Sequence, residues 1–285
     1  MKVGLLSLLM FVCCVSLSGT NDDSWVYELK PSDFNKTKVL AEKGDLDAQH
    51  KLGVMYVRGV GVKKDEKIGY AWYRRAASKG HADSQYIVGD LAELEGDYEL
   101  ALKWFSEAAN QGHLRAQVHL GSSYTGRGGT CPIDYRLAIK WYTKAALQGH
   151  ELACWDLAQI FDGTLSLRGK WIHPLSADNP LKEYIDYKKA FLYYKKAAFL
   201  GSESCQRKVG GMYESGVGIT ADFVKSYAWL SVAKSNGNEA AWGSLVELTK
   251  KMSKEQIALG QVMSGELFKE IENWDEDSPV HTRFD

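Results

Sequence analysis

Residues 65–80 read Asp-Glu-Lys-Ile-Gly-Tyr-Ala-Trp-Tyr-Arg-Arg-Ala-Ala-Ser-Lys-Gly, and this stretch predicts an α-helix with both ends marked. Asp65 is a favoured N-cap, because its carboxylate accepts hydrogen bonds from the free amides of the first turn. Gly80 is the matching stop signal, since glycine enters the left-handed conformation at little cost. Between them, small and aromatic residues fall on one helical face: Gly69, Trp72, Tyr73, Ala76 and Ala77.

The same pattern recurs five times along the chain. Each copy has an Asp followed fifteen positions later by a Gly: Asp65 and Gly80, Asp97 and Gly112, Asp134 and Gly149, Asp186 and Gly201, Asp222 and Gly237. Nine positions after the Gly that opens each copy stands another small residue: Gly53, Gly89, Gly121, Ala158 and Gly210. Only the segment from that residue to the next Asp varies, from 8 residues (89–97) to 28 (158–186). Fixed segments joined by one variable loop predict a solenoid of stacked helix pairs.

A further helix precedes each Asp; we call it the first helix of its repeat, and the Asp-to-Gly helix the second. Its pattern is Ala48, Leu52, Gly53 and Tyr56 in the first copy, and it returns in later copies. A Gly within a helix costs about 1 kcal/mol relative to Ala. Its return at one register therefore predicts a helix crossing too close for a side chain. The Trp of the second helix, Trp72 in the first copy, is expected to pack between helices.

These residues carry a resemblance to a known family. The pattern of an Ala, a Leu-Gly pair and a Tyr, then Gly59-Val-Gly61-Val, Asp, a Trp-Tyr pair, two Ala and Gly-His resembles the Sel-one-like repeat, a relative of the tetratricopeptide repeat. The resemblance covers about 48–238. It implies an all-α fold, an α/α right-handed superhelical solenoid of about five helix pairs with capping helices. It also implies a protein-interaction scaffold.

The repeat boundaries give a predicted domain organisation. A signal peptide is expected at 1–19, an N-terminal segment with a capping helix at 20–47, C-terminal capping helices at 239–272 and an acidic tail at 273–285. The five repeats are expected at about 48–82, 83–114, 115–151, 152–202 and 203–238. Ser253-Lys-Glu-Gln256 reads as a capping box that opens a final helix.

The first residues predict export. Lys2 supplies a positive start, residues 3–15 an apolar core shorter than a membrane span, and residues 16–19 a small-residue cleavage region. We therefore expect a periplasmic or secreted protein without an integral membrane segment after cleavage. The net charge of −1 offers no basic stripe for phosphates, so nucleic-acid binding is not expected.

Cleavage would leave Cys131, Cys154 and Cys205, an odd number of thiols. Cys131 follows a first helix and Cys154 opens the next, so a helix of about 19 Å separates them. That exceeds the limit of about 7 Å between bridged Cα atoms, and we expect no disulfide between them. Cys154 and Cys205 are the only plausible pair, although the core position of Cys205 favours a buried thiol.

The sequence shows no phosphate loop, zinc spacing or nucleophile elbow, so no catalytic residue, cofactor or metal site is expected. His81, His113 and His150 each follow a repeat Gly, and first helices 8–10 Å apart would keep them from sharing one ion. We interpret them as turn residues. Ser231-Val-Ala-Lys234 matches the S-x-x-K of penicillin-recognising enzymes, but repeat architecture already explains its position.

Two regions are expected to bind a partner. The first is the concave face, where first helices line the groove of related repeats; its candidates lie three and six residues beyond the repeat Ala. They are Lys51, Val54, Ile87, Asp90, His119, Ser122, Asp156, Gln159, Lys208 and Gly211. The second is the insertion at 164–182, with Trp171 and His173, which is either a binding loop or an ornament packed on its own repeat.

Together these features predict an exported scaffold that binds a protein or peptide partner, in an adaptor, assembly or host-interaction role. Two alternatives stay open at this stage: a β-lactam-binding hydrolase and a cell-wall glycan-binding protein. Nitrocefin turnover would favour the first alternative, and pelleting with purified peptidoglycan the second.

Overall fold

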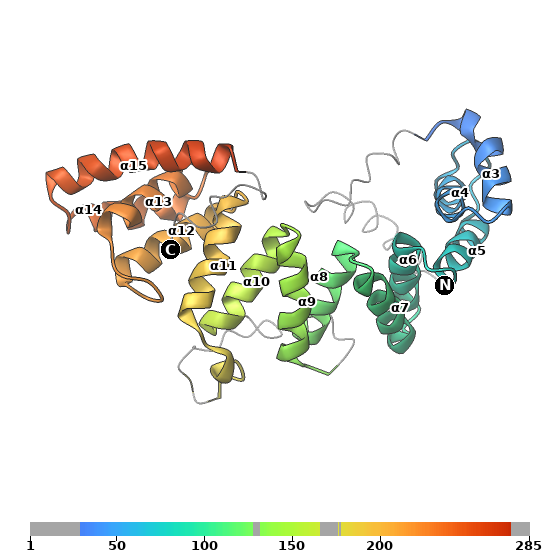
Figure 1. Cartoon of the computed structure of the whole chain (residues 1–285), viewed down its shortest axis with the longest axis horizontal. Helices are drawn as coiled ribbons and strands as arrows, with labels where there is room; N and C mark the ends of the chain where they lie inside the picture. The colour runs from blue at the N-terminus through green and yellow to red at the C-terminus, as the bar shows by residue number, and fades with distance from the viewer. Residues whose placement is uncertain (1–28, 128–131, 166–175, 177, 275–285) are drawn as a thin grey trace, which may run out of the picture. The chain divides into compact units, whose positions relative to one another are not determined.

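The structure, a computed structural model, describes residues 29–127, 132–165, 176 and 178–274. Within these ranges the chain forms thirteen α-helices and no β-strand, which confirms the all-α repeat fold (Figure 1). The predicted signal peptide and residues 275–285 of the predicted tail lie outside the described ranges. None of the described helices combines the length and the apolar character that crossing a bilayer requires.

The first of two compact units ends at Ser84. It contains a short 3-10 helix (Pro31–Asp33), α3 (Phe34–Glu42), α4 (Leu46–Arg58), α5 (Glu66–Ala77) and the first turn of α6 (Ala82–Leu94). α4 packs against both α3 and α5. The core of this unit contains Ala41, Ala48 and Leu52, and Trp72 packs against them.

The second unit begins at Gln85 and contains the rest of α6 and the remaining repeats. Its helices are α7 (Tyr98–Asn110), α8 (Leu114–Tyr124), α9 (Tyr135–Leu147), α10 (Glu151–Asp162), α11 (Tyr187–Phe199), α12 (Glu203–Ser215), α13 (Phe223–Ser235), α14 (Glu239–Thr249) and α15 (Lys254–Glu272), with a 3-10 helix at Lys182–Tyr184. From α7 to α14 each helix packs on the next along the chain, and α15 returns onto α13. Figure 1 shows these helices following one another from green to red.

The repeat Asp caps its helix in all five copies, as predicted. In each, a carboxylate oxygen accepts a hydrogen bond from the amide three residues later, over 3.0–3.1 Å: Asp65, Asp97, Asp134, Asp186 and Asp222. The Gly fifteen positions on has a positive φ in every copy, for example +98° at Gly80 and +102° at Gly201. The final helix also begins as predicted, because Ser253 and Gln256 form a reciprocal capping box.

A backbone hydrogen bond explains why the loop before the Asp can change length without disturbing the repeat. The Asp amide donates to the carbonyl of the residue three positions after the small residue of the first helix, which is aromatic in four copies and is Ala92 in the second. The bond joins Asp65 to Tyr56 over 2.9 Å, and it joins Asp186 to Phe161 over 2.8 Å across the long insertion. Each loop is therefore closed at the same two points, whatever lies between them.

The repeat Gly allows the close helix crossing that the sequence predicts. A Cβ built on Gly121 of α8 would lie 2.6 Å from Cδ1 of Tyr142, whose ring is fully buried. Gly53 and Tyr73 show the same relation, at 2.7 Å. The aromatic side chain of the second helix is thus seated directly on the backbone of the first.

A ladder of side-chain amides also joins the repeats, and it was not predicted from the sequence. The Gln117 side-chain amide donates to the Ala109 carbonyl over 3.1 Å, and Gln148 donates to the Gln117 side-chain oxygen over 2.8 Å. Gln206 repeats the first of these bonds with Ala198. The sequence signal was a Gln four positions before the Gly inside the first helix, as Gln117 precedes Gly121 and Gln206 precedes Gly210. It satisfies a carbonyl at the end of the preceding helix, where no intrahelical donor exists.

The three repeat Trp residues differ in burial. Trp141 is 5% exposed and packs in a cluster with α7 and α8 residues such as Phe105 and Leu120, as the sequence predicts. Trp72 and Trp104 are half-buried, and the Lys103 ammonium lies 5.7 Å from the centre of the Trp104 ring. The expectation of a fully packed ring therefore holds for Trp141 and is too strong for the other two.

The described ends of the insertion are packed. Leu165 and Leu181 are buried, and the Asn179 amide donates to the Gly163 carbonyl over 3.1 Å. Trp171 and His173 lie outside the described residues, as does Cys131, so the predictions on them stay predictions. Cys154 and Cys205 are both buried and no disulfide joins them, which agrees with the expectation of a buried thiol at Cys205.

Candidate functional site

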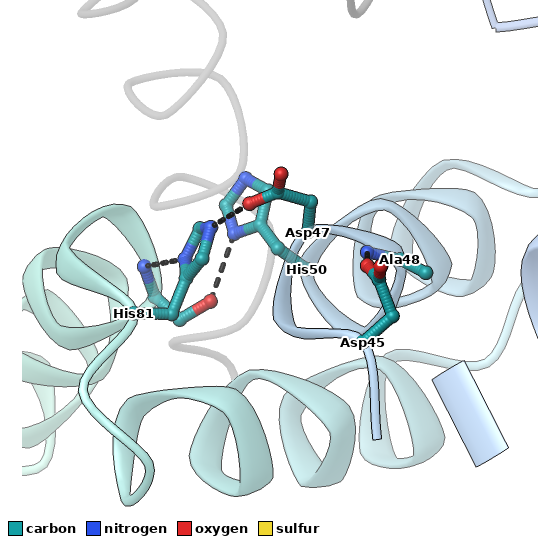
Figure 2. A network of polar contacts seen from close by, with 6 residues as sticks. Asp45, Asp47, Ala48, His50 and His81 are labelled. Carbon is teal, nitrogen blue, oxygen red and sulfur yellow. Dashed lines mark hydrogen bonds and ion pairs between the residues drawn. The ribbon is translucent and has the colours of Figure 1, made fainter. Parts of the chain in front are cut away.

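The polar cluster of the first unit resembles a hydrolase triad in composition, but its connections differ. Figure 2 shows the imidazole of His81 pointing toward Asp47, with Nε2 3.2 Å from a carboxylate oxygen. The other ring nitrogen of His81 accepts from the backbone amide of Ser84, not from its hydroxyl. The Ser84 hydroxyl instead bonds His50 over 2.9 Å, and Ser84 is fully buried. A buried hydroxyl of this kind cannot reach a substrate, so the cluster has a structural role and links α4 to the first turn of α6.

The histidines after the repeat Gly act as helix caps, which confirms their interpretation as turn residues. Nδ1 of His113 accepts from the Ala116 amide over 3.1 Å, and Nδ1 of His150 accepts from Ala153 over 3.2 Å. Accepting this bond requires an unprotonated Nδ1. Burial lowers the pKa of His150, with the charge of Asp156 opposing the change, and this favours the neutral form that caps.

The Lys of the S-x-x-K pair on α13 contacts an aromatic side chain of the next helix. The Lys234 ammonium lies 4.0 Å from the centre of the Trp242 ring, an exposed indole on α14. A cation–π contact of this kind stabilises the charged ammonium. The contact found for Lys234 is thus with Trp242, and it adds no support for the β-lactam alternative.

Side-chain contacts to a carboxylate link successive first helices of the second unit. Nε2 of His119 on α8 lies 3.0 Å from a carboxylate oxygen of Glu93 on α6. Lys208 on α12 lies 3.2 Å from Asp162 on α10 in the same register. Between these two pairs, Arg127 after α8 contacts Asp156 on α10 over 2.6 Å. Each pair therefore joins one repeat to the next.

We call the surface that carries these pairs the first-helix face. Its residues in the second unit are Ile87, Asp90, Glu93, His119, Ser122, Arg127, Asp156, Gln159, Asp162, Lys208 and Gly211. Apart from Asp156 and Asp162, which are buried, these residues are half-buried or exposed. The face is consequently polar, partly accessible and fixed by contacts between repeats.

Among the predicted groove residues of the second unit, Asp90 lies beside His119, and Arg127 contacts both Asp156 and Gln159; one predicted position needs correction. Asp156 is 8% exposed, because the Arg127 guanidinium covers its carboxylate. In the first unit Lys51 is exposed but Val54 is 6% exposed, a second correction, since an apolar side chain at that position turns into the α4 core. The remaining predicted residues keep accessible surface, and their role in binding stays a prediction.

Three members of the face were not predicted. Glu93, Arg127 and Asp162 lie one turn or more beyond the predicted positions, where the first helix ends. Asp162 also accepts a hydrogen bond from the hydroxyl of Tyr194 over 2.7 Å. For Glu93 and Asp162 the signal was a charged residue four positions after the repeat small residue, but only packing shows which charge it meets.

Burial changes the ionisation of one carboxyl on this face. It raises the pKa of Asp90 to about 7, while the charges of His119 and Arg115 oppose the rise. Tyr86 forms a side-chain hydrogen bond with Asp90. Near neutral pH this carboxyl is therefore partly protonated, unlike an ordinary surface aspartate.

A family model described as Sel1 repeat matches residues 46–81, 82–113, 114–150, 181–202 and 204–238, together more than half of the chain. The fourth match begins at residue 181, so it leaves α10 and the described insertion residues before Leu181 outside. No curated protein matches the chain.

Among solved structures, the chain is similar to a Sel1 repeat protein from Oxalobacter formigenes, with 25% identity, a TM-score of 0.58, and coverage of 83% of this chain and 95% of that chain. It is also similar to c5321, a protective antigen present in uropathogenic Escherichia coli strains that displays an SLR fold (22% identity, 88% and 61% coverage, TM-score 0.43). A putative Sel1 repeat protein from Klebsiella pneumoniae subsp. pneumoniae is a further match (20% identity, 75% and 98% coverage, TM-score 0.39). The first of these similarities agrees with the helix-pair architecture described above.

Proposed function

Because the chain belongs to the Sel1 repeat family, we propose that it is an exported scaffold that binds a protein or peptide partner through the first-helix face. Sel1 repeats generally mediate protein interaction. The observation that carries the proposal is the series of side-chain contacts to carboxylates between successive first helices. These contacts order the side chains of His119 and Lys208 before a partner binds, so less side-chain entropy is lost on binding.

The charges of the face point to the chemistry of the partner. Asp90, Glu93, Asp156 and Asp162 are its acidic groups, whereas Arg127 and Lys208 are its permanent cations. A segment with a net positive charge and backbone donors complements such a surface. Export is proposed from the sequence alone, on Lys2 and the apolar run that follows it.

An affinity-capture experiment with matched variants tests the proposal. Gly211→Arg introduces a bulky charge on the first-helix face, at a position where an added Cβ meets nothing within 4 Å. Leu192→Arg is the control, because Leu192 is 55% exposed on the second helix α11. The mature protein and both variants are used to capture partners from the native envelope fraction, with quantification by mass spectrometry.

We expect one or more proteins to bind the wild type and Leu192→Arg and to be depleted at least about tenfold with Gly211→Arg, a loss of 1.4 kcal/mol. Equal capture by all three proteins would show that the first-helix face is not the binding surface. Capture that Leu192→Arg abolishes and Gly211→Arg preserves would place binding on the second helices.

A further inference from the structure

Three side chains with metal-ligating atoms meet on the first-helix face between α6 and α8. Asp90 and Glu93 stand one turn apart on α6, and His119 reaches them from α8. One ligand atom from each lies within 4.8 Å of the other two. Nε2 of His119 lies 3.0 Å from a carboxylate oxygen of Glu93. The group therefore presents two carboxylates and one imidazole to a single point.

The imidazole of His119 is held in the orientation that ligation requires. The ring of Phe105 stacks on it with the centroids 4.0 Å apart. The Ser123 hydroxyl lies 3.4 Å from Nδ1, on the side of the ring away from Glu93. Metal-binding histidines typically use the second ring nitrogen for such a hydrogen bond, which leaves the first directed at the ion.

The equivalent junction two repeats later, between α10 and α12, carries different charges. There the Asp162 carboxylate meets the Lys208 ammonium, a permanent positive charge. At the α6–α8 junction Glu93 meets an imidazole, and Asp90 adds a second carboxyl beside it. Arg115 also acts on Asp90 through its charge, but less than His119 does. A divalent cation would supply the charge that lysine provides at the later junction.

We propose that Asp90, Glu93 and His119 bind one divalent transition-metal ion, of the zinc class. Mixed imidazole and carboxylate donors favour such ions over magnesium or calcium. In a tetrahedral site, ligand atoms about 2.1 Å from the ion are about 3.4 Å apart, so a separation of up to 4.8 Å must close by at most about 1.4 Å on binding. Three protein ligands leave coordination positions open to water or to a group of a bound partner.

Titration of the untagged, metal-free protein with zinc chloride by calorimetry tests this proposal without a partner, so it can fail independently of the scaffold function. The variants are Asp90→Asn, Glu93→Gln and His119→Gln. His113→Asn is the matched control, because it removes another histidine beside α8 while Asn still caps the helix. Circular dichroism establishes that each variant is folded. Cobalt(II) spectra provide a second readout, since a site without thiolates lacks the sulfur-to-cobalt charge-transfer band.

We expect one saturable zinc site in the wild type and in His113→Asn, and affinity at least about tenfold weaker in each of the three ligand variants. If Asp90→Asn or His119→Gln is unfolded, Glu93→Gln alone decides, because Glu93 is half-exposed. Absence of saturable zinc binding in the wild type would overturn the proposal. Unchanged affinity in the folded ligand variants, or a cobalt spectrum with the thiolate band, would overturn it as well.

Discussion

Replacing Gly121 by Ala tests the close helix crossing found in four of the five copies, the fourth of which has Ala158 at this position. The added methyl carbon would lie 2.6, 2.7 and 2.8 Å from three ring atoms of Tyr142. An ordinary contact needs at least about 3.4 Å, so the ring or the helix must move by most of an ångström. Tyr142 is fully buried between its neighbours, which leaves the ring little room to move.

Two opposing effects set the size of the change in stability. Ala in a helix is favoured over Gly by about 1 kcal/mol. Overpacking of a well-packed core costs about 1–3 kcal/mol, and a rigid ring against backbone places this site at the upper end. We therefore expect Gly121→Ala to lower the free energy of unfolding by about 2 kcal/mol.

Gly211→Ala is the matched control. Gly211 lies in the first helix α12, but a Cβ there would meet nothing within 4 Å. Only the helix-propensity effect remains, so this variant should gain about 0.5–1 kcal/mol. Urea denaturation followed by circular dichroism measures both variants. If Gly121→Ala matched or exceeded the stability of the wild type, α8 and α9 could not cross as closely as described.

Three further predictions concern the core, the caps and a thiol. Trp141→Ala should lower the free energy of unfolding by about 3–5 kcal/mol through cavity formation, measured by denaturant titration, and a loss below about 1 kcal/mol would place the ring at the surface. Because burial lowers the pKa of His150, the stability it provides is present above the unfolded pKa of 6.5 and is lost as the pH falls below it. His150→Asn should cap without titrating, so its melting temperature should fall less between pH 7 and pH 5 than that of the wild type; equal falls would contradict the role of the imidazole. Burial raises the pKa of Cys205 to about 12, so its thiol should resist Ellman's reagent until urea unfolds the protein, and rapid labelling at pH 8 would show that the site is open.

The structural features that depend on single residues were predicted correctly from the sequence. The Asp caps, the glycines with positive φ and the capping box at Ser253 depend only on backbone geometry within a few residues, and all are found in the structure. The close approach at Gly121 was also predictable, because a glycine repeated inside helices has a cost that packing must offset. These local rules were sufficient to establish helix pairs and their order.

The candidate site was predicted only in part. His119 and Asp90 were placed on the expected face by helical spacing, but Glu93, which completes the cluster, was not. Asp156 was expected to be accessible and is instead covered by Arg127, from a loop whose course the sequence did not specify. Helical spacing fixes the side of a helix on which a residue lies, but it cannot tell which residue of the next repeat faces it.

The class of fold, the number of helix pairs and the ends of the Asp-to-Gly helices could be predicted from the sequence, since these follow from interactions within about four residues along the chain. Which charges meet between repeats depends on tertiary packing. Asp90 and Glu93 on α6 meet His119 on α8, although the histidine is 26 residues from Glu93 in the chain. Contacts across that separation depend on the distance and rotation between helices, to which every buried side chain of the core contributes.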